Sequence, residues 1–192
     1  MINSRSIAAS LLLITSANAS WAAGPNNGTG PFTNLPGTNA IRDAYAAIQR
    51  EAGVAEALRS GDQSLTLRQK IVGAGIETTK FQSFYKGVQV LGSTVSHHKG
   101  LRGVVEVSND LARFDLDTRP TVSQQSAVAL AKGEGGDKVL KGAPALKILP
   151  SDNADSAQLI YWVTLEGTPT EAGSNLLIDA HTGATIANSR IT

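Results

Sequence analysis

Apolar residues in the chain follow a helical spacing first and a strand spacing afterwards. In residues 39–53 the apolar side chains of Ile41, Tyr45 and Ile48 fall three to four positions apart, which predicts an amphipathic helix. In residues 76–107 apolar and polar positions alternate in runs separated by turn residues, which is the period of half-buried strands. This half of the chain is therefore predicted to be a helix followed by an antiparallel meander.

The remainder of the chain begins with a second helix signal. Ser123 is a typical N-cap because its hydroxyl can accept from the free N–H groups of the first turn, and Gly133 suits the left-handed position after the last turn. Apolar strands are then predicted at 143–149, 158–166, 176–179 and 184–187. A helix followed by several strands predicts an α+β fold with helices packed on antiparallel sheets.

A tight turn is predicted between the last two of these strands. Asp179 and Thr182 have side chains that satisfy turn backbone groups, and Gly183 tolerates a positive φ that other residues resist. These three residues are predicted to determine the fold rather than to perform chemistry. His181 in the same turn is expected to form a local hydrogen bond.

Composition narrows the classes of function. The 192 residues include no cysteine, which excludes disulfides, thiolate catalysis and cysteine-ligated zinc. The formal net charge is +1 and no basic stripe is present, so nucleic acid is not an expected partner.

The N-terminal residues have the three-part pattern of a secretory signal peptide. One basic residue, Arg5, precedes an apolar run at 7–14 that is too short to span a bilayer of roughly 30 Å, and small residues follow. Residues 1–22 are therefore predicted to direct export, and residues 23–39, rich in Gly, Pro and Asn, to form a flexible linker. The expected location is secreted or periplasmic, with no membrane attachment after signal cleavage.

The histidines do not form a recognisable catalytic pattern. No His-Glu-x-x-His occurs, and the chain has only His97, His98 and His181. Neighbouring strand residues point to opposite faces, so His97 and His98 are expected to be exposed hairpin residues rather than ligands of one metal ion. No enzymatic activity, cofactor or metal is expected.

Candidate partner contacts lie at a predicted hairpin turn. Tyr85 and Lys86 end one strand and Val88 begins the next, around Gly87. A tyrosine is suited to a protein interface because its ring is apolar and its hydroxyl is polar. The hypothesis is that this end of the hairpin contacts another protein.

Two stretches resemble a known pairing of domains. Residues 81–92, with the spacing Tyr-Lys-Gly-Val-x-Val-x-Gly from Tyr85, are similar to the fungalysin/thermolysin propeptide domain. Residues 123–132, the run Leu-Ile-Tyr-Trp-Val at 159–163 and the run Ile-Asp-Ala-His-Thr-Gly at 178–183 resemble a PepSY domain. The likeness extends over residues 65–188 and resembles the pro-region of secreted thermolysin-like zinc metalloproteases.

The resemblance implies an organisation and a role. Two small cystatin-like or PepSY-like subdomains are expected, at 40–118 and 119–192. The implied role is inhibition and folding assistance of a zinc metalloprotease catalytic domain, in cis or in trans, by steric cover of its active-site cleft. The alternative is an extracytoplasmic PepSY-type module that binds or senses peptides or small ligands, because a fold alone does not determine a function.

Overall fold

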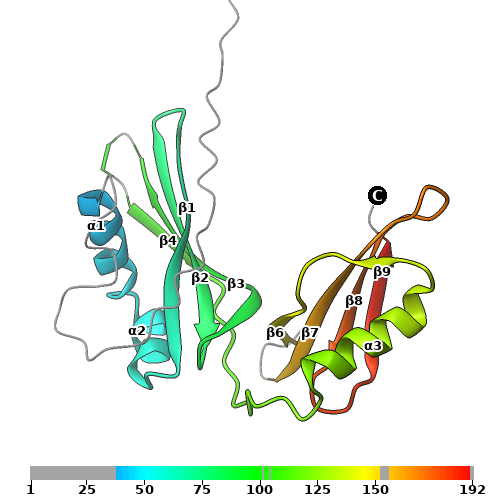
Figure 1. Ribbon diagram of the computed structural model, residues 1–192. Coiled ribbons are helices and arrows are strands. Elements are labelled where there is room, and N and C mark those ends of the chain that lie inside the picture. The colour runs from blue at the N-terminus through cyan, green and yellow to red at the C-terminus, as the bar shows by residue number, and fades with distance from the viewer. Residues whose placement is uncertain (1–37, 101, 104, 152–155, 191–192) are drawn as a thin grey trace, which may run out of the picture.

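The computed structural model describes residues 38–100, 102–103, 105–151 and 156–190 (Figure 1). Within them the helices are α1 (Thr38–Ile48), α2 (Ala52–Arg59) and α3 (Gln124–Gly135). The strands are β1 (Gln63–Gly73), β2 (Ile76–Tyr85), β3 (Val88–Lys99), β4 (Val105–Asn109), β5 (Val139–Leu140), β6 (Ala145–Pro150), β7 (Ala157–Glu166), β8 (Ser174–Asp179) and β9 (Thr185–Arg190). The predicted signal peptide and almost all of the predicted linker lie outside the described residues.

The strands form one sheet. Its order is β1-β2-β3-β6-β7-β8-β9, while β4 pairs with β3 and β5 pairs with β7, which makes nine strands within the described part of the chain. Sequential neighbours pair antiparallel, but β3 and β6 run parallel and pair at Gln89 with Lys147 and at Val90 with Ile148. The sheet is therefore mixed, and its parallel pairing joins the first half of the chain to the second.

The predicted fold class, helices packed on antiparallel sheets in two small cystatin-like or PepSY-like subdomains, is wrong. The structure is dominated by strands: the longest helix has 12 residues, whereas β1, β2, β3 and β7 have 10 to 12 each. One mixed nine-stranded sheet replaces separate antiparallel ones. The physical reason is the β3–β6 pairing, which joins strand edges that are far apart in the sequence.

Two helices cover one face of the first four strands. Ile41, Ala44 and Ile48 of α1 form a buried cluster with Phe81 and Val95 of the sheet. The predicted helix at 39–53 ends early, at Ile48, and a second helix begins at Ala52, after Glu51 takes an extended conformation. The helical spacing of apolar residues nevertheless places the buried face of α1 correctly.

The second buried cluster lies between α3 and the strands β6 to β8 (Figure 1). Ala127 and Ala131 of α3 pack on strand residues of which Leu159 and Ile178 are fully buried. Small alanines let the helix approach the sheet closely. Ser123 caps the helix as predicted, with its hydroxyl accepting from the Ser126 N–H at 3.1 Å.

The end of α3 differs from the prediction. The helix passes Gly133 and continues to Gly135, and Gly136 has the positive φ of 63° that ends it. Gly135 is buried against Leu165 of β7, so close that a Cβ there would overlap the Leu165 side chain. Close packing of helix on strand, not helix termination, explains this glycine.

Each of the two buried clusters is made mainly of residues from one half of the chain. One contains residues of α1, α2 and β1 to β3, and the other contains residues of β2, β3, α3 and β6 to β8. Tyr85 and Val90 belong to the second cluster although their strands belong to the first half. The domain boundary between 118 and 119 stays a prediction.

We expect two glycines of α3 to respond oppositely to alanine. Gly135→Ala should lower the free energy of unfolding by about 1–3 kcal/mol because the added methyl overlaps Leu165. Gly133→Ala is the matched control: nothing lies within 4 Å of its Cβ position, so it should raise stability by about 0.5–1 kcal/mol through helix propensity. Urea unfolding followed by circular dichroism measures both, and equal effects would contradict this packing account.

Candidate functional site

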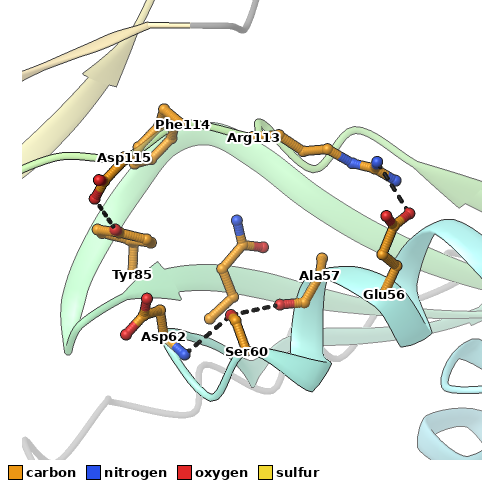
Figure 2. Close-up of a pocket in the computed structure, with 9 residues that line it drawn as sticks. Glu56, Ala57, Ser60, Asp62, Tyr85, Arg113, Phe114 and Asp115 are labelled. Atoms are coloured by element: carbon orange, nitrogen blue, oxygen red, sulfur yellow. Dashed lines mark hydrogen bonds and ion pairs between the residues drawn. The ribbon is translucent and has the colours of Figure 1, made fainter.

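A groove lies beside the hairpin turn that joins β2 and β3. Its first hollow has a volume of about 330 Å³ and is bordered by the end of α2, the end of β2 and the extended segment at 113–115 (Figure 2). The lining residues are Glu56, Ala57, Ser60, Asp62, Gln63, Tyr85, Arg113, Phe114 and Asp115. Figure 2 shows the Glu56–Arg113 pair at one end of the hollow and the Tyr85–Asp115 pair at the other.

A second shallow hollow lies on the chain beside Asp115. Its volume is about 440 Å³, and it is lined by Lys86, Asp115, Leu116, Asp117 and Arg119. Asp115 borders both hollows, and its side chain is 97% exposed. We call the two hollows together the Asp115 groove.

Lys86 lies at the turn between the two strands. Its φ is +47° and that of Gly87 is +82°, so both central residues of this hairpin turn are left-handed. The Lys86 N–H donates to the Asp62 carbonyl oxygen at 2.6 Å, which ties the turn to the connection between α2 and β1. The backbone of this turn is therefore anchored to the wall of the groove.

The Lys86 side chain reaches across to the other wall. Its Nζ lies 4.8 Å from the centre of the Tyr85 ring and 3.7 Å from Asp115 Oδ1. The Tyr85 hydroxyl raises the pKa of Lys86 above its ordinary value, with smaller contributions from the carboxylates of Asp62 and Asp115. The ammonium group is therefore charged at neutral pH.

Tyr85 forms a wall of the groove rather than an exposed contact. Its side chain is 3% exposed, its ring lies 5.0 Å from that of Phe114 at an angle of 58°, and its hydroxyl donates to Asp115 Oδ1 at 3.1 Å. Val88 is half-buried against the second cluster. Of the three predicted partner contacts, Lys86 is the exposed one, and partner contact by all three stays a prediction.

One buried acceptor beside the first hollow has no donor within the described part of the chain. The Gln63 side-chain nitrogen donates to the Ala112 carbonyl at 2.9 Å, which orients the amide and leaves its buried Oε1 without a partner. The carboxylate of Asp62, in the same hollow, is half-buried and contributes to the raised pKa of Lys86. An unpaired buried acceptor typically costs about 1–3 kcal/mol.

The sequence did not single out most of this groove. The segment at 113–117 alternates charged and apolar residues, and Phe114 and Leu116 pack on the second cluster while Arg113, Asp115 and Asp117 remain exposed. That alternation is the sequence feature from which this wall of the groove could have been predicted. It was missed because the segment pairs with no strand and lies next to the predicted domain boundary.

The predicted turn at Asp179 has a complete set of hydrogen bonds. Asp179 Oδ1 accepts from the N–H groups of His181 at 2.8 Å and of Thr182 at 2.7 Å. Thr182 Oγ1 accepts from the Ala184 N–H at 3.2 Å, and Gly183 has a φ of +77°. Burial alone would raise the pKa of Asp179, but the backbone N–H groups of Thr182 and His181 outweigh it and hold the pKa below its ordinary value.

This turn also contacts the end of the groove. His181 Nε2 donates to the carbonyl oxygen of Arg119 at 3.2 Å, and the Ala180 carbonyl accepts from the N–H groups of Thr121 and Val122. The turn therefore supports the segment that leads from the groove into α3.

The expectation that both histidines of β3 are exposed is wrong for His97. Its side chain is 5% exposed, its Nδ1 has no partner among the described residues, and burial lowers its pKa. His98 is half-buried, with Nδ1 at 3.0 Å from Thr78 Oγ1. Among the described residues no group of three or more His, Cys, Asp or Glu side chains is arranged to hold a metal ion.

Comparisons with known proteins return little. The chain matches no family in a scan against protein-family models, and a search of curated proteins finds no match. Among solved structures it is similar to the Bacillus megaterium YpeB C-terminal domain, with 16% identity and a TM-score of 0.40. The alignment covers 83% of this chain and 66% of that one, slightly less than two thirds of its length. A similarity this low assigns no function, and the resemblance to protease pro-regions stays a hypothesis.

The structure also bears on membrane insertion. Within the described ranges, no helix has the length and apolar character needed to cross a bilayer.

Replacing Asp179 tests its role in the turn. Asp179→Ala should lower the free energy of unfolding by about 1–3 kcal/mol at neutral pH because two backbone N–H groups lose their acceptor. Asp179→Asn should lower the free energy of unfolding by less, since its side-chain oxygen can still accept from these N–H groups. The matched control is Asp137→Ala, at an exposed position without a side-chain bond, and it should change stability by less than about 0.5 kcal/mol.

The same variants should differ with pH. Because the folded pKa of Asp179 is lowered, the advantage of wild type over Asp179→Asn should be fully present above the unfolded carboxyl pKa of about 3.9. It should disappear as the pH falls through the lower folded pKa. Urea titrations from neutral pH to about pH 3 check this, and an advantage that grows in acid would contradict it.

Burial of His97 predicts a loss of stability in a higher pH range. Since burial lowers its folded pKa, the unfolded state binds the proton first, so stability should fall as the pH drops below about 6.5 and level off below the folded pKa. His97→Gln should remove this slope, which for one proton is at most about 1.4 kcal/mol per pH unit. Urea unfolding between neutral pH and about pH 5 measures the difference, and parallel curves for the two proteins would rule the mechanism out.

Proposed function

We propose that this chain is an extracytoplasmic PepSY-type binding module that holds an extended peptide segment in the Asp115 groove. The observation that carries the proposal is the pair of adjoining hollows that share Asp115 and extend from Glu56 to Arg119. Export is supported by the signal-peptide pattern at residues 1–22, and the PepSY class by the resemblance of residues 123–183.

The chemistry of the groove favours a peptide over a small apolar ligand. Small-molecule sites are mostly apolar and enclose most of the ligand. This groove is open at Asp115 and its lining includes cations and anions, with Arg113 and Lys86 facing Glu56 and Asp115. A peptide, which has both N–H donors and C=O acceptors along its backbone, matches such a mixed lining.

The rigid parts of the groove favour binding without large rearrangement. The Lys86 turn is anchored by its hydrogen bond to Asp62, and the Tyr85 ring is packed against Phe114. Preformed walls reduce the ordering cost of association.

The narrower hypothesis, an inhibitor and folding assistant of a thermolysin-like protease, has the sequence resemblance as its support. It differs from the peptide-binding role because the chain itself would cover the active-site cleft of the protease. This narrower hypothesis is tested by measuring whether the chain and its variants inhibit thermolysin.

The test is selection of a phage-displayed library of random dodecapeptides on the full chain. Enriched peptides should bind with dissociation constants in the micromolar range, about −8 kcal/mol. Asp115→Ala should weaken them by about tenfold because it removes the exposed carboxylate that is proposed to contact the peptide. The matched control, Asp137→Ala, should bind as wild type does.

Two results would overturn the proposal: no peptide enriches, or the Asp115 variant binds every enriched peptide as tightly as the control. Inhibition of thermolysin by wild type, weakened by Asp115→Ala, would support the narrower role in addition.

A further inference from the structure

The sheet face opposite α3 carries a tryptophan that none of the helices in the described ranges covers. Along β7, the side chains of Leu159, Tyr161, Val163 and Leu165 belong to the cluster beneath α3, so Trp162 between them points to the other face. In the register of the sheet, Trp162 lies opposite Leu177 of β8 on one side and Ala145 of β6 on the other. Trp162 and Leu177 are both half-buried. We call this surface the Trp162 face; α3 lies on the other side of these strands (Figure 1).

The hydrogen bonds within this face leave donor groups without an acceptor among the described residues. The Trp162 indole N–H donates to Asn175 Oδ1 at 3.2 Å, and the Thr164 hydroxyl donates to the same oxygen at 2.8 Å. An indole N–H can only donate, so these two bonds establish which atom of the Asn175 amide is oxygen. The two N–H groups of the Asn175 nitrogen then have no acceptor in the described part of the chain.

A cation lies over the same ring. Lys147 of β6 places its Nζ 4.7 Å from the centre of the Trp162 ring. Lys147 takes part in none of the ion pairs found among the described residues, and it is half-buried. Burial lowers the pKa of its ammonium group, as expected for a cation without a carboxylate beside it.

We propose that the Trp162 face docks an acidic segment of a partner protein, with a carboxylate accepting from Lys147 and Asn175 and an apolar side chain on Trp162 and Leu177. The argument is charge complementarity beside the Trp162 ring, where Lys147 has no carboxylate partner and the Asn175 amide nitrogen has no acceptor among the described residues. The carboxylates on the same face are already engaged: Glu166 pairs with Lys141, and Asp179 accepts from the turn that follows it. Trp is also enriched at the centre of protein interfaces. This surface is separate from the Asp115 groove, so the inference does not depend on the proposed function.

The alternative acceptor is a nucleic-acid phosphate. The near-neutral charge of the chain, +1, supplies no extended basic surface, so the acidic protein is favoured. An oligonucleotide is therefore an arm of the test.

The experiment uses the full chain labelled with ¹⁵N and observes the indole N–H of Trp162 by NMR. The chain has two tryptophans, and Trp162→Phe assigns the signal. The probes are an acetylated hexapeptide of alternating glutamate and valine, the same peptide with lysine for glutamate, and a thymidine oligonucleotide. The glutamate peptide should shift the Trp162 signal in a saturable manner that weakens with salt, and the lysine peptide should not.

Two variants test the proposed contacts. Lys147→Met keeps the apolar stem over the ring and removes the charge, and it should raise the dissociation constant of the glutamate peptide by about tenfold. Asn175→Asp keeps the oxygen that Trp162 and Thr164 need and replaces the donor by an anion, so it should weaken binding by a similar factor. The matched control is Lys132→Met, at an exposed position of α3 on the opposite side, which should bind as wild type does.

Each remaining outcome overturns the proposal. These are no saturable shift with the glutamate peptide, equal binding of the lysine peptide, tighter binding of the oligonucleotide, or wild-type affinity in Lys147→Met and Asn175→Asp. Because Asn175→Asp preserves the internal hydrogen bonds, the test stands even if Lys147→Met does not fold.

Discussion

The pairing of β3 with β6 holds the rest of the structure in place. It consists of two residue pairs, Gln89 with Lys147 and Val90 with Ile148, in parallel orientation. Val90 and Ile148 are almost completely buried, so apolar packing reinforces the backbone bonds. Through this contact Tyr85 and Val90, from the first half, enter the buried cluster of the second.

Both candidate surfaces depend on that contact. The Asp115 groove is built around Tyr85 and Lys86, immediately before β3, and around the segment that runs from the first half to α3. Lys147 of the Trp162 face lies on β6, at the pairing itself. The position of each surface therefore depends on β3, which pairs with β2 in the first half of the sheet and with β6 in the second.

Local features of this fold could be predicted from the sequence, and long-range ones could not. Alternation around Val105 and Val107, the Ser123 cap and the Lys86-Gly87 turn are set by neighbouring residues, and each has a counterpart in the structure. The β3–β6 pairing joins residues separated by a helix and several turns, and no local period encodes it. The burial of His97 was missed for the same reason: two residues before it on β3, Val95 packs in the cluster with α1, an element distant in the sequence. The groove was predicted in part: Tyr85 and Lys86 were candidates, whereas Asp115 was not, because the alternating segment around it pairs with no strand.

The left-handed backbone of Lys86 implies a compromise between folding and surface chemistry. A lysine in this conformation costs about 1 kcal/mol relative to glycine, and asparagine is the residue that such a turn favours when glycine follows. The turn itself would be served better by asparagine, yet the ammonium group over Tyr85 and beside Asp115 would then be absent. A chain selected for stability alone would drift away from lysine at this position, so its presence marks the turn as a place where strain accompanies a charged contact.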